Sequence, residues 1–185
     1  MLHRGDEYPP FSLQETMSDQ RHYLTILGLG NILLQDEGFG VYFIRWFDER
    51  YQLPDSVRII DGGTLGFGLF DTITSCKNLI VIDAIKTDDE PGSIYRFTQH
   101  EMELSHPQAT SAHEVEFADI LCKAELIDQA PTAVFLCIVP AQYDAHNMQV
   151  GMTPLMHERF VDMEKFLLKE LTALDIYPVR KQCHA

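Results

Sequence analysis

Positive charge is scarce in this sequence. Its 185 residues include 14 Lys and Arg against 28 Asp and Glu, which gives a formal net charge of −14 at pH 7. The sequence contains no run rich in Lys and Arg. Nucleic-acid binding draws much of its free energy from contacts with phosphates, so this balance argues against a nucleic-acid partner. An acidic chain is also repelled by anionic membranes, and the simplest effect of its charge is solubility.

Cysteine is sparse and shows no pattern of its own. The four cysteines, at positions 76, 122, 137 and 183, form no C-x-x-C pair and have no zinc-like spacing. A chain of this length buries roughly 70% of its unfolded surface on folding, so it needs neither disulfides nor a structural metal. Cys122 and Cys137 lie in apolar runs, and we expect both in the core.

Long apolar runs are absent as well. No segment approaches 18 uninterrupted apolar residues, and residues 1–22 lack the apolar stretch of a secretory signal. We therefore expect no transmembrane helix and a cytoplasmic location. We interpret residues 1–22 as a flexible N-terminal extension, 23–174 as one α/β domain and 175–185 as a C-terminal tail.

The sequence does contain an alternation of strand and helix patterns. Short apolar runs bounded by Gly, Pro or an acidic residue predict five strands, over 23–28, 57–61, 79–83, 93–97 and 133–139. Helical spacing predicts helices that end near 51, cover 65–74, begin at 111 and cover 154–171. This order predicts an α/β fold, a three-layer sandwich in which helices flank a mostly parallel sheet of about five strands.

Two of these helices have a predicted start and a predicted core face. Thr153 and Pro154 supply an N-cap and a proline at the first helical position. The face that follows comprises Met156, Phe160, Met163, Leu167 and Leu171. Ser111 begins an S-x-x-E capping box. The face expected after it comprises Val115, Ala118, Cys122 and Leu126.

Acidic residues stand where strands are predicted to end. In open α/β sheets, ligands bind outside the carboxyl ends of the strands. Glu37 lies in the loop after the first strand, next to Asp36, and either residue could instead cap the following helix. Asp83 directly follows four apolar residues, where a charge is costly unless it is paired or binds a ligand. A turn cap is the structural alternative for Asp83.

His113 is the histidine with the most distinctive setting. It falls at the second position of the helix predicted from Ser111, where the positive end of the helix dipole disfavours an imidazolium. Neutral imidazole is the form that binds metals. A surface histidine is the structural alternative, and His106 in the same loop is the nearest rival. One imidazole and two carboxylates would hold a metal weakly, which suits a metal presented by a partner.

The glycine loop after the first strand does not fit a dinucleotide site. That fingerprint requires G-x-G-x-x-G and an acidic residue about 20 positions later. Here Leu33 occupies the place of the third glycine, and Asp61 comes 31 residues after Gly30. The loop also carries two acidic residues where a phosphate would bind. Phosphate binding is therefore disfavoured.

Four segments in order carry a family resemblance. The segment Gly28-Leu-Gly-Asn-Ile-Leu-Leu-Gln-Asp-Glu-Gly-Phe-Gly-Val41 resembles the opening motif of hydrogenase maturation endopeptidases. The segment Asp61-Gly-Gly-Thr64 resembles the second motif, and Ile82-Asp83-Ala84 followed by Pro91-Gly92 resembles the third. His113, just before a helical pattern, matches the histidine of the family. The likeness covers residues 23–173.

The resemblance implies an activity, a partner and a site. Such hydrolases remove a C-terminal peptide from the precursor of the nickel–iron hydrogenase large subunit, after nickel insertion and close to the cysteine motif that binds it. By position, Glu37, Asp83 and His113 would contact the metal, and Asp61 would support them. Asp36 could replace Glu37 in part. The nickel would come with the precursor and not as a resident cofactor, and a metal or a carboxylate would activate water, as in an aspartic or metal-dependent peptidase.

Two other functions fit parts of the sequence. A non-catalytic chaperone that holds the large subunit would share the same partner. Peptidyl-tRNA hydrolases also begin with a strand and a Gly-Leu-Gly-Asn turn, but they require a basic face, and they have a proline where this chain has Ile32. No Ser-His-Asp or Cys-His arrangement is apparent in the sequence, so a covalent acyl-enzyme is not favoured.

Overall fold

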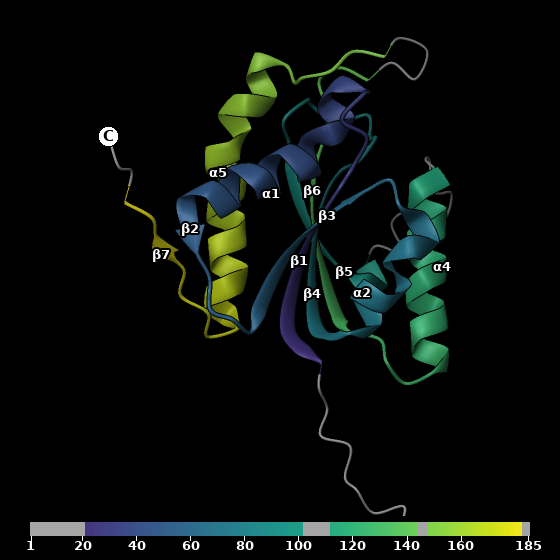
Figure 1. Cartoon of the computed structure of the whole chain (residues 1–185). Coiled ribbons are helices and arrows are strands. Elements are labelled where there is room, and N and C mark those ends of the chain that lie inside the picture. The colour runs from purple at the N-terminus through teal and green to yellow at the C-terminus, as the bar shows by residue number, and fades with distance from the viewer. Residues whose placement is uncertain (1–20, 102–111, 144–147, 183–185) are drawn as a thin grey trace, which may run out of the picture.

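The chain folds around one five-stranded sheet with helices on both faces (Figure 1). The computed structural model describes residues 21–101, 112–143 and 148–182, and for 112–116 it describes the backbone alone. The predicted extension therefore lies almost entirely outside the described residues. Within the described residues, no helix has the length and apolarity needed to span a bilayer.

The sheet has the order β3-β1-β4-β6-β5. Strand β1 pairs in parallel with β3 and β4, β4 pairs in parallel with β6, and β5 joins β6 antiparallel. The strands comprise β1 (His22–Leu29), β3 (Val57–Gly63), β4 (Cys76–Ala84), β5 (Ile94–Thr98) and β6 (Thr132–Ile138). The predicted three-layer α/β fold with a mostly parallel five-stranded sheet is confirmed.

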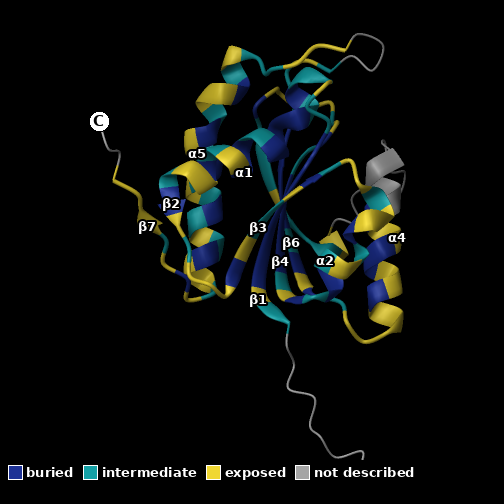
Figure 2. Cartoon of the chain, in the orientation of Figure 1, coloured by how far each residue is buried: buried dark blue, intermediate teal, exposed yellow. Residues whose placement is uncertain are grey.

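Two apolar layers cover the two faces of the sheet (Figure 2). On one face, α1 (Phe39–Arg50) and α5 (Pro154–Ala173) form an aromatic-rich core with residues such as Phe39, Phe43 and Phe160. On the other face, η2 (Gly66–Leu69), α2 (Phe70–Thr74) and α4 (Ala112–Leu126) pack over Leu79 and Val81. Because alternate residues of β4 enter opposite layers, its continuous apolar run is explained.

The predicted core face of α5 is confirmed, and that of α4 is wrong. All five residues expected on α5 are buried. Among the α4 side chains that the structure describes, from 117 onward, the buried ones are instead Phe117, Ile120, Leu121 and Ala124, and the predicted Val115 lies outside them. Leu126 is 80% exposed, and Cys122 is exposed, contrary to its expected place in the core. The cause is that α4 carries apolar residues on more than one face, so spacing alone did not select the right one.

The chain stays packed beyond the end of α5. Ile176 is buried in the aromatic-rich core, and β7 (Val179–Arg180) pairs antiparallel with β2 (Tyr51–Gln52). The Lys181 backbone N–H also donates to the Arg50 carbonyl at 2.7 Å. Residues 175–182, which the sequence pattern placed in a tail, therefore cover the end of α1.

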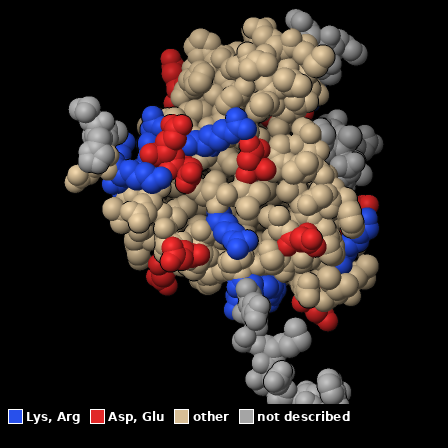
Figure 3. Space-filling model, in the orientation of Figure 1, with Lys and Arg blue, Asp and Glu red and all other residues tan. Residues whose placement is uncertain are grey.

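Charged side chains of both signs intermingle on the surface. On the face shown in Figure 3, Lys and Arg side chains lie beside Asp and Glu side chains. The ion pairs Arg96–Glu170, Arg159–Asp162 and Lys165–Asp162 follow the same pattern. The face in this view offers no separate basic area of the kind that nucleic-acid binding requires.

Candidate functional site

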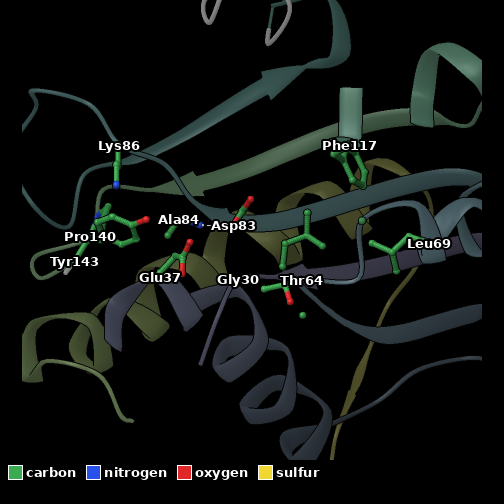
Figure 4. Close-up of a pocket in the computed structure, with 13 residues that line it drawn as sticks. Gly30, Glu37, Thr64, Leu69, Asp83, Ala84, Lys86, Phe117, Pro140 and Tyr143 are labelled. Atoms are coloured by element: carbon green, nitrogen blue, oxygen red, sulfur yellow. Dashed lines mark hydrogen bonds between the residues drawn. The ribbon is translucent and has the colours of Figure 1, made fainter. Parts of the chain in front are cut away.

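A pocket that is partly open to solvent lies at the carboxyl edge of the sheet (Figure 4). Every strand of the parallel part contributes to it through its own C-terminal end or the loop that follows. The lining residues are Leu29, Gly30, Glu37, Gly63, Thr64, Gly66, Leu69, Asp83, Ala84, Lys86, Phe117, Pro140 and Tyr143. Glu37 and Asp83, which the sequence placed at this edge, thus line one cavity.

Glu37 reaches the pocket from η1 (Gln35–Gly38), the 3-10 turn that precedes α1. Its Oε2 atom is shielded from solvent. Gly30 makes this position possible, because it has a φ of +125° and a Cβ there would collide with the Glu37 carbonyl. The glycine after the first strand therefore serves close packing of the turn that carries Glu37.

Asp36, the neighbour of Glu37, has a structural role. It is fully buried, and its carboxylate accepts hydrogen bonds from Ala141 N (3.1 Å) and Gln142 N (2.8 Å). It also accepts from Thr153 N (2.8 Å) and Thr153 Oγ1 (3.0 Å). Thr153 is the N-cap of α5 as predicted, but its hydroxyl donates to Asp36 and does not cap the helix. Asp36 does not line the pocket and these four donors engage its carboxylate, so the expectation that it could replace Glu37 is wrong.

Asp83 ends the apolar run of β4 and lines the pocket from the sheet. Its Oδ1 accepts a hydrogen bond of 2.8 Å from the Ala84 N–H. The backbone contact fixes the carboxyl group at the strand end, and the side chain is half-buried there. Figure 4 shows the Asp83 and Glu37 side chains on neighbouring walls of one cavity. The two carboxylates singled out by the sequence therefore do converge.

Asp61 lies on β3 just outside this group. Its Oδ2 accepts hydrogen bonds from Arg45 of α1, with the closest contact at 2.6 Å, and both side chains are largely exposed. Gly63 and Thr64 line the pocket, whereas Asp61 does not. Its position is that of a residue that ties β3 to α1.

We therefore expect a small effect from Asp61→Asn. Exposed ion pairs contribute about 1 kcal/mol or less, so the melting temperature should fall by less than about 4 °C. Catalysis of any kind in the pocket should fall by less than about tenfold, because the side chain does not reach the cavity. Thermal unfolding and an activity assay on the same preparation measure both effects. A loss as large as that caused by removing a pocket carboxylate would place Asp61 in the site.

His113 lies in the first turn of α4, as the capping box predicted. Its side chain, and the whole of His106, lie outside the described residues. Position 113 is one turn before Phe117, which lines the pocket. Within the described residues, no three His, Cys, Asp or Glu side chains form a metal-binding group. The two pocket carboxylates alone would hold a divalent ion weakly.

The sequence analysis did not indicate several residues of the pocket, among them Leu69, Lys86, Phe117 and Tyr143. Lys86 and Tyr143 come from the loops after β4 and β6, and the Lys86 ammonium lies 3.1 Å from the centre of the Tyr143 ring. At the opposite end, Leu69 and Phe117 form an apolar wall (Figure 4). No local pattern indicates that these loops meet. The pocket thus has a charged end, which includes Glu37, and an apolar end.

The three cysteines that the structure describes do not add a nucleophile to this arrangement. Burial raises the pKa of the Cys76 thiol above its usual value, so the thiol stays protonated at neutral pH. Cys137 is buried in the sheet as predicted, and Cys122 lies on the outer face of α4. None of the three lines the pocket. The charged end of the pocket therefore supports acid–base and metal-contact chemistry and not thiolate attack.

Residues 41–170 match the family model described as hydrogenase maturation protease. The Hydrogenase 2 maturation protease of Escherichia coli is 33% identical over 133 residues, which cover 71% of this chain and 79% of that protein. The hydrogenase expression/formation protein HupD of Bradyrhizobium diazoefficiens is 37% identical over 64% of this chain, but the match spans only 62% of HupD. The solved hydrogenase maturating endopeptidase HybD from E. coli superposes with a TM-score of 0.80 at 27% identity, over 86% of this chain and 98% of HybD.

Proposed function

The chain belongs to the hydrogenase maturation protease family, and we propose that it removes the C-terminal extension of a nickel–iron hydrogenase large-subunit precursor. The observation that carries this proposal is the convergence of Glu37 and Asp83 in one pocket at the carboxyl edge of the sheet. The pocket is open to solvent on one side, as a site for a segment of another protein must be.

The donor set fits nickel that arrives with the precursor. Two carboxylates, with a third ligand from His113, make a loose site for a borderline divalent ion. Such a site would contact nickel already bound by the precursor and would thereby align the adjacent peptide bond. Nickel here is part of the substrate, and the chemistry it supplies is Lewis acidity toward a carbonyl or a water molecule.

The residues of the chain would then bind and orient the peptide. The wall formed by Leu69 and Phe117 suits an apolar side chain of the precursor next to the cleaved bond. One carboxylate at the charged end accepts a proton from water as it attacks the carbonyl carbon. The same proton then passes to the leaving amine, so that the bond breaks without a covalent enzyme intermediate.

The decisive experiment compares nickel-loaded and nickel-free precursor. The full-length chain is incubated with each form, and the products are weighed by mass spectrometry. We expect one cleavage near the C-terminus of the nickel-loaded form and none of the nickel-free form. Binding of the precursor without cleavage would identify a non-catalytic chaperone. Equal cleavage of both forms would remove nickel recognition from the proposal and leave the peptidase activity.

His113 provides a further prediction. We expect His113→Ala to lower both nickel affinity and precursor cleavage by about tenfold or more, because the variant loses the nitrogen ligand. Nickel binding by the unaltered chain should weaken as the pH falls through the imidazole range, since protons and metal compete for that nitrogen. Calorimetric titration at several pH values measures this. His106→Ala is the matched control, and equal losses in both variants would assign the ligand to neither residue.

A further inference from the structure

The pocket that holds the two carboxylates also contains a cation. Lys86 follows β4 by two residues and lines the same cavity as Glu37 and Asp83. Among the described lining residues it is the one Lys or Arg side chain. In Figure 4 the Lys86 amine lies at the charged end of the pocket, close to Ala84 and Pro140 and far from Phe117.

Tyr143 holds this cation in place. The Lys86 Nζ atom lies 3.1 Å from the centre of the Tyr143 ring, a close cation–π contact. The residue before Tyr143, Gln142, donates its N–H to the buried Asp36 carboxylate. The ring is thereby anchored to the same turn that carries Glu37. The position of the positive charge is consequently fixed relative to the carboxylates, unlike that of a lysine free to swing in solvent.

Three acidic residues follow Lys86 in the loop, and they lie outside the pocket. These residues are Asp88, Asp89 and Glu90. The Asp89 carboxylate accepts a hydrogen bond from Thr87 Oγ1 at 3.2 Å, and the Asp89 N–H donates to the same hydroxyl oxygen at 3.1 Å. None of these three acids lines the pocket. The charged residues that line the pocket are therefore two carboxylates and one ammonium, and the buried Asp36 carboxylate lies in the same turn as Glu37.

We propose that Lys86 is a specificity-determining residue that prevents the two carboxylates from capturing free divalent cations. This inference rests on the proposed function, because it takes Glu37 and Asp83 as the contacts for nickel. A hydrated nickel ion carries a charge of +2 and is repelled by the fixed ammonium. Nickel already bound by thiolates of the precursor has most of that charge neutralised, and it escapes most of the repulsion. Lys86 thus discriminates by the net charge of the incoming metal group.

The test is nickel binding to the isolated full-length chain, measured by calorimetric titration at fixed ionic strength. Removing the charge with Lys86→Met should raise nickel affinity about threefold to tenfold, as expected for a +1 and a +2 charge about 6–12 Å apart that interact through a water-like dielectric in this solvent-open pocket. Lys86→Arg keeps the charge and should bind nickel like the unaltered chain. Lys165→Met is the matched control, because it removes the same charge from α5, where Lys165 pairs with Asp162 outside the pocket.

The double variant Glu37→Gln with Lys86→Met separates this inference from the proposed function. Loss of the gained affinity in the double variant supports both. An unchanged affinity in Lys86→Met, together with weaker binding in Glu37→Gln, overturns the role of Lys86 and leaves the nickel contact standing. A gain that persists in the double variant, or that appears equally in Lys165→Met, also overturns it, because the ion would then bind elsewhere. Higher salt should shrink the gain, since screening weakens the repulsion.

Discussion

Replacement of Asp83 by Asn is expected to lower precursor cleavage by about 100-fold or more while the protein stays folded. Asn keeps the volume of the side chain and an oxygen that can accept the 2.8 Å hydrogen bond from Ala84 N–H. What it loses is the negative charge, which a metal contact or a general base requires. The effect should therefore appear in catalysis and hardly at all in the melting temperature.

The measurement is the initial rate of cleavage of nickel-loaded precursor, together with thermal unfolding of the same sample. Asp61→Asn is the matched control, since it makes the same chemical change at the end of β3, beside the pocket and not in its wall. Full activity in the Asp83 variant would exclude Asp83 from the site. A large fall in melting temperature would instead assign Asp83 to the structure of the strand end.

The second large effect is expected from Asp36, and it should concern stability. In Asp36→Asn, an amide –NH₂ replaces an oxygen, and it faces N–H and O–H donors from Ala141, Gln142 and Thr153. Buried donors that lose their acceptor cost about 1–3 kcal/mol each, in part relieved by rearrangement. We expect a loss of about 2–4 kcal/mol in the free energy of unfolding, or about 5–15 °C in melting temperature.

Glu37→Gln, at the neighbouring position, is expected to reduce cleavage and to leave stability almost unchanged. It makes the same carboxylate-to-amide change on the side chain that lines the pocket. We expect it to abolish most cleavage and to change the melting temperature by less than about 4 °C. Denaturant unfolding and the cleavage assay, applied to both variants, should give effects of opposite kind. Stability losses of equal size would show that both acids are structural, and near-normal activity of Glu37→Gln would remove it from the site.

Much of the fold could be predicted because its signals are local. The run Leu79–Asp83 and the five apolar residues of α5 each indicate their structure within a few turns of chain. The rule that ligands bind at the carboxyl ends of parallel strands then brought Glu37 and Asp83 to one edge. The face of α4 was missed because Cys122 and Leu126 are apolar yet point outward, and periodicity cannot rank two apolar faces.

The remainder of the site depends on contacts between distant segments. Asp36 and Thr153 are 117 positions apart, and Lys86 and Tyr143 come from different loops. The sequence around each of these residues contains no pattern that indicates which distant residue it contacts. The loops after β4 and β6 meet at the turn that carries Glu37. This meeting, which only the folded structure shows, buries Asp36 and brings the Lys86 cation beside the carboxylates.

The strand order also determines when each strand can find its neighbour during synthesis. β5 precedes β6 in the chain, yet β6 lies between β4 and β5 in the sheet. A nascent chain that has emerged only as far as β5 therefore has no neighbour for that strand, and the apolar edge of β4 stays open. At ribosomal rates of about 5–20 residues per second, the 34 positions from Thr98 to Thr132 take about 2–7 s. The lining of the pocket is complete only after Tyr143 has emerged, so the full site forms late in the synthesis of the 185 residues.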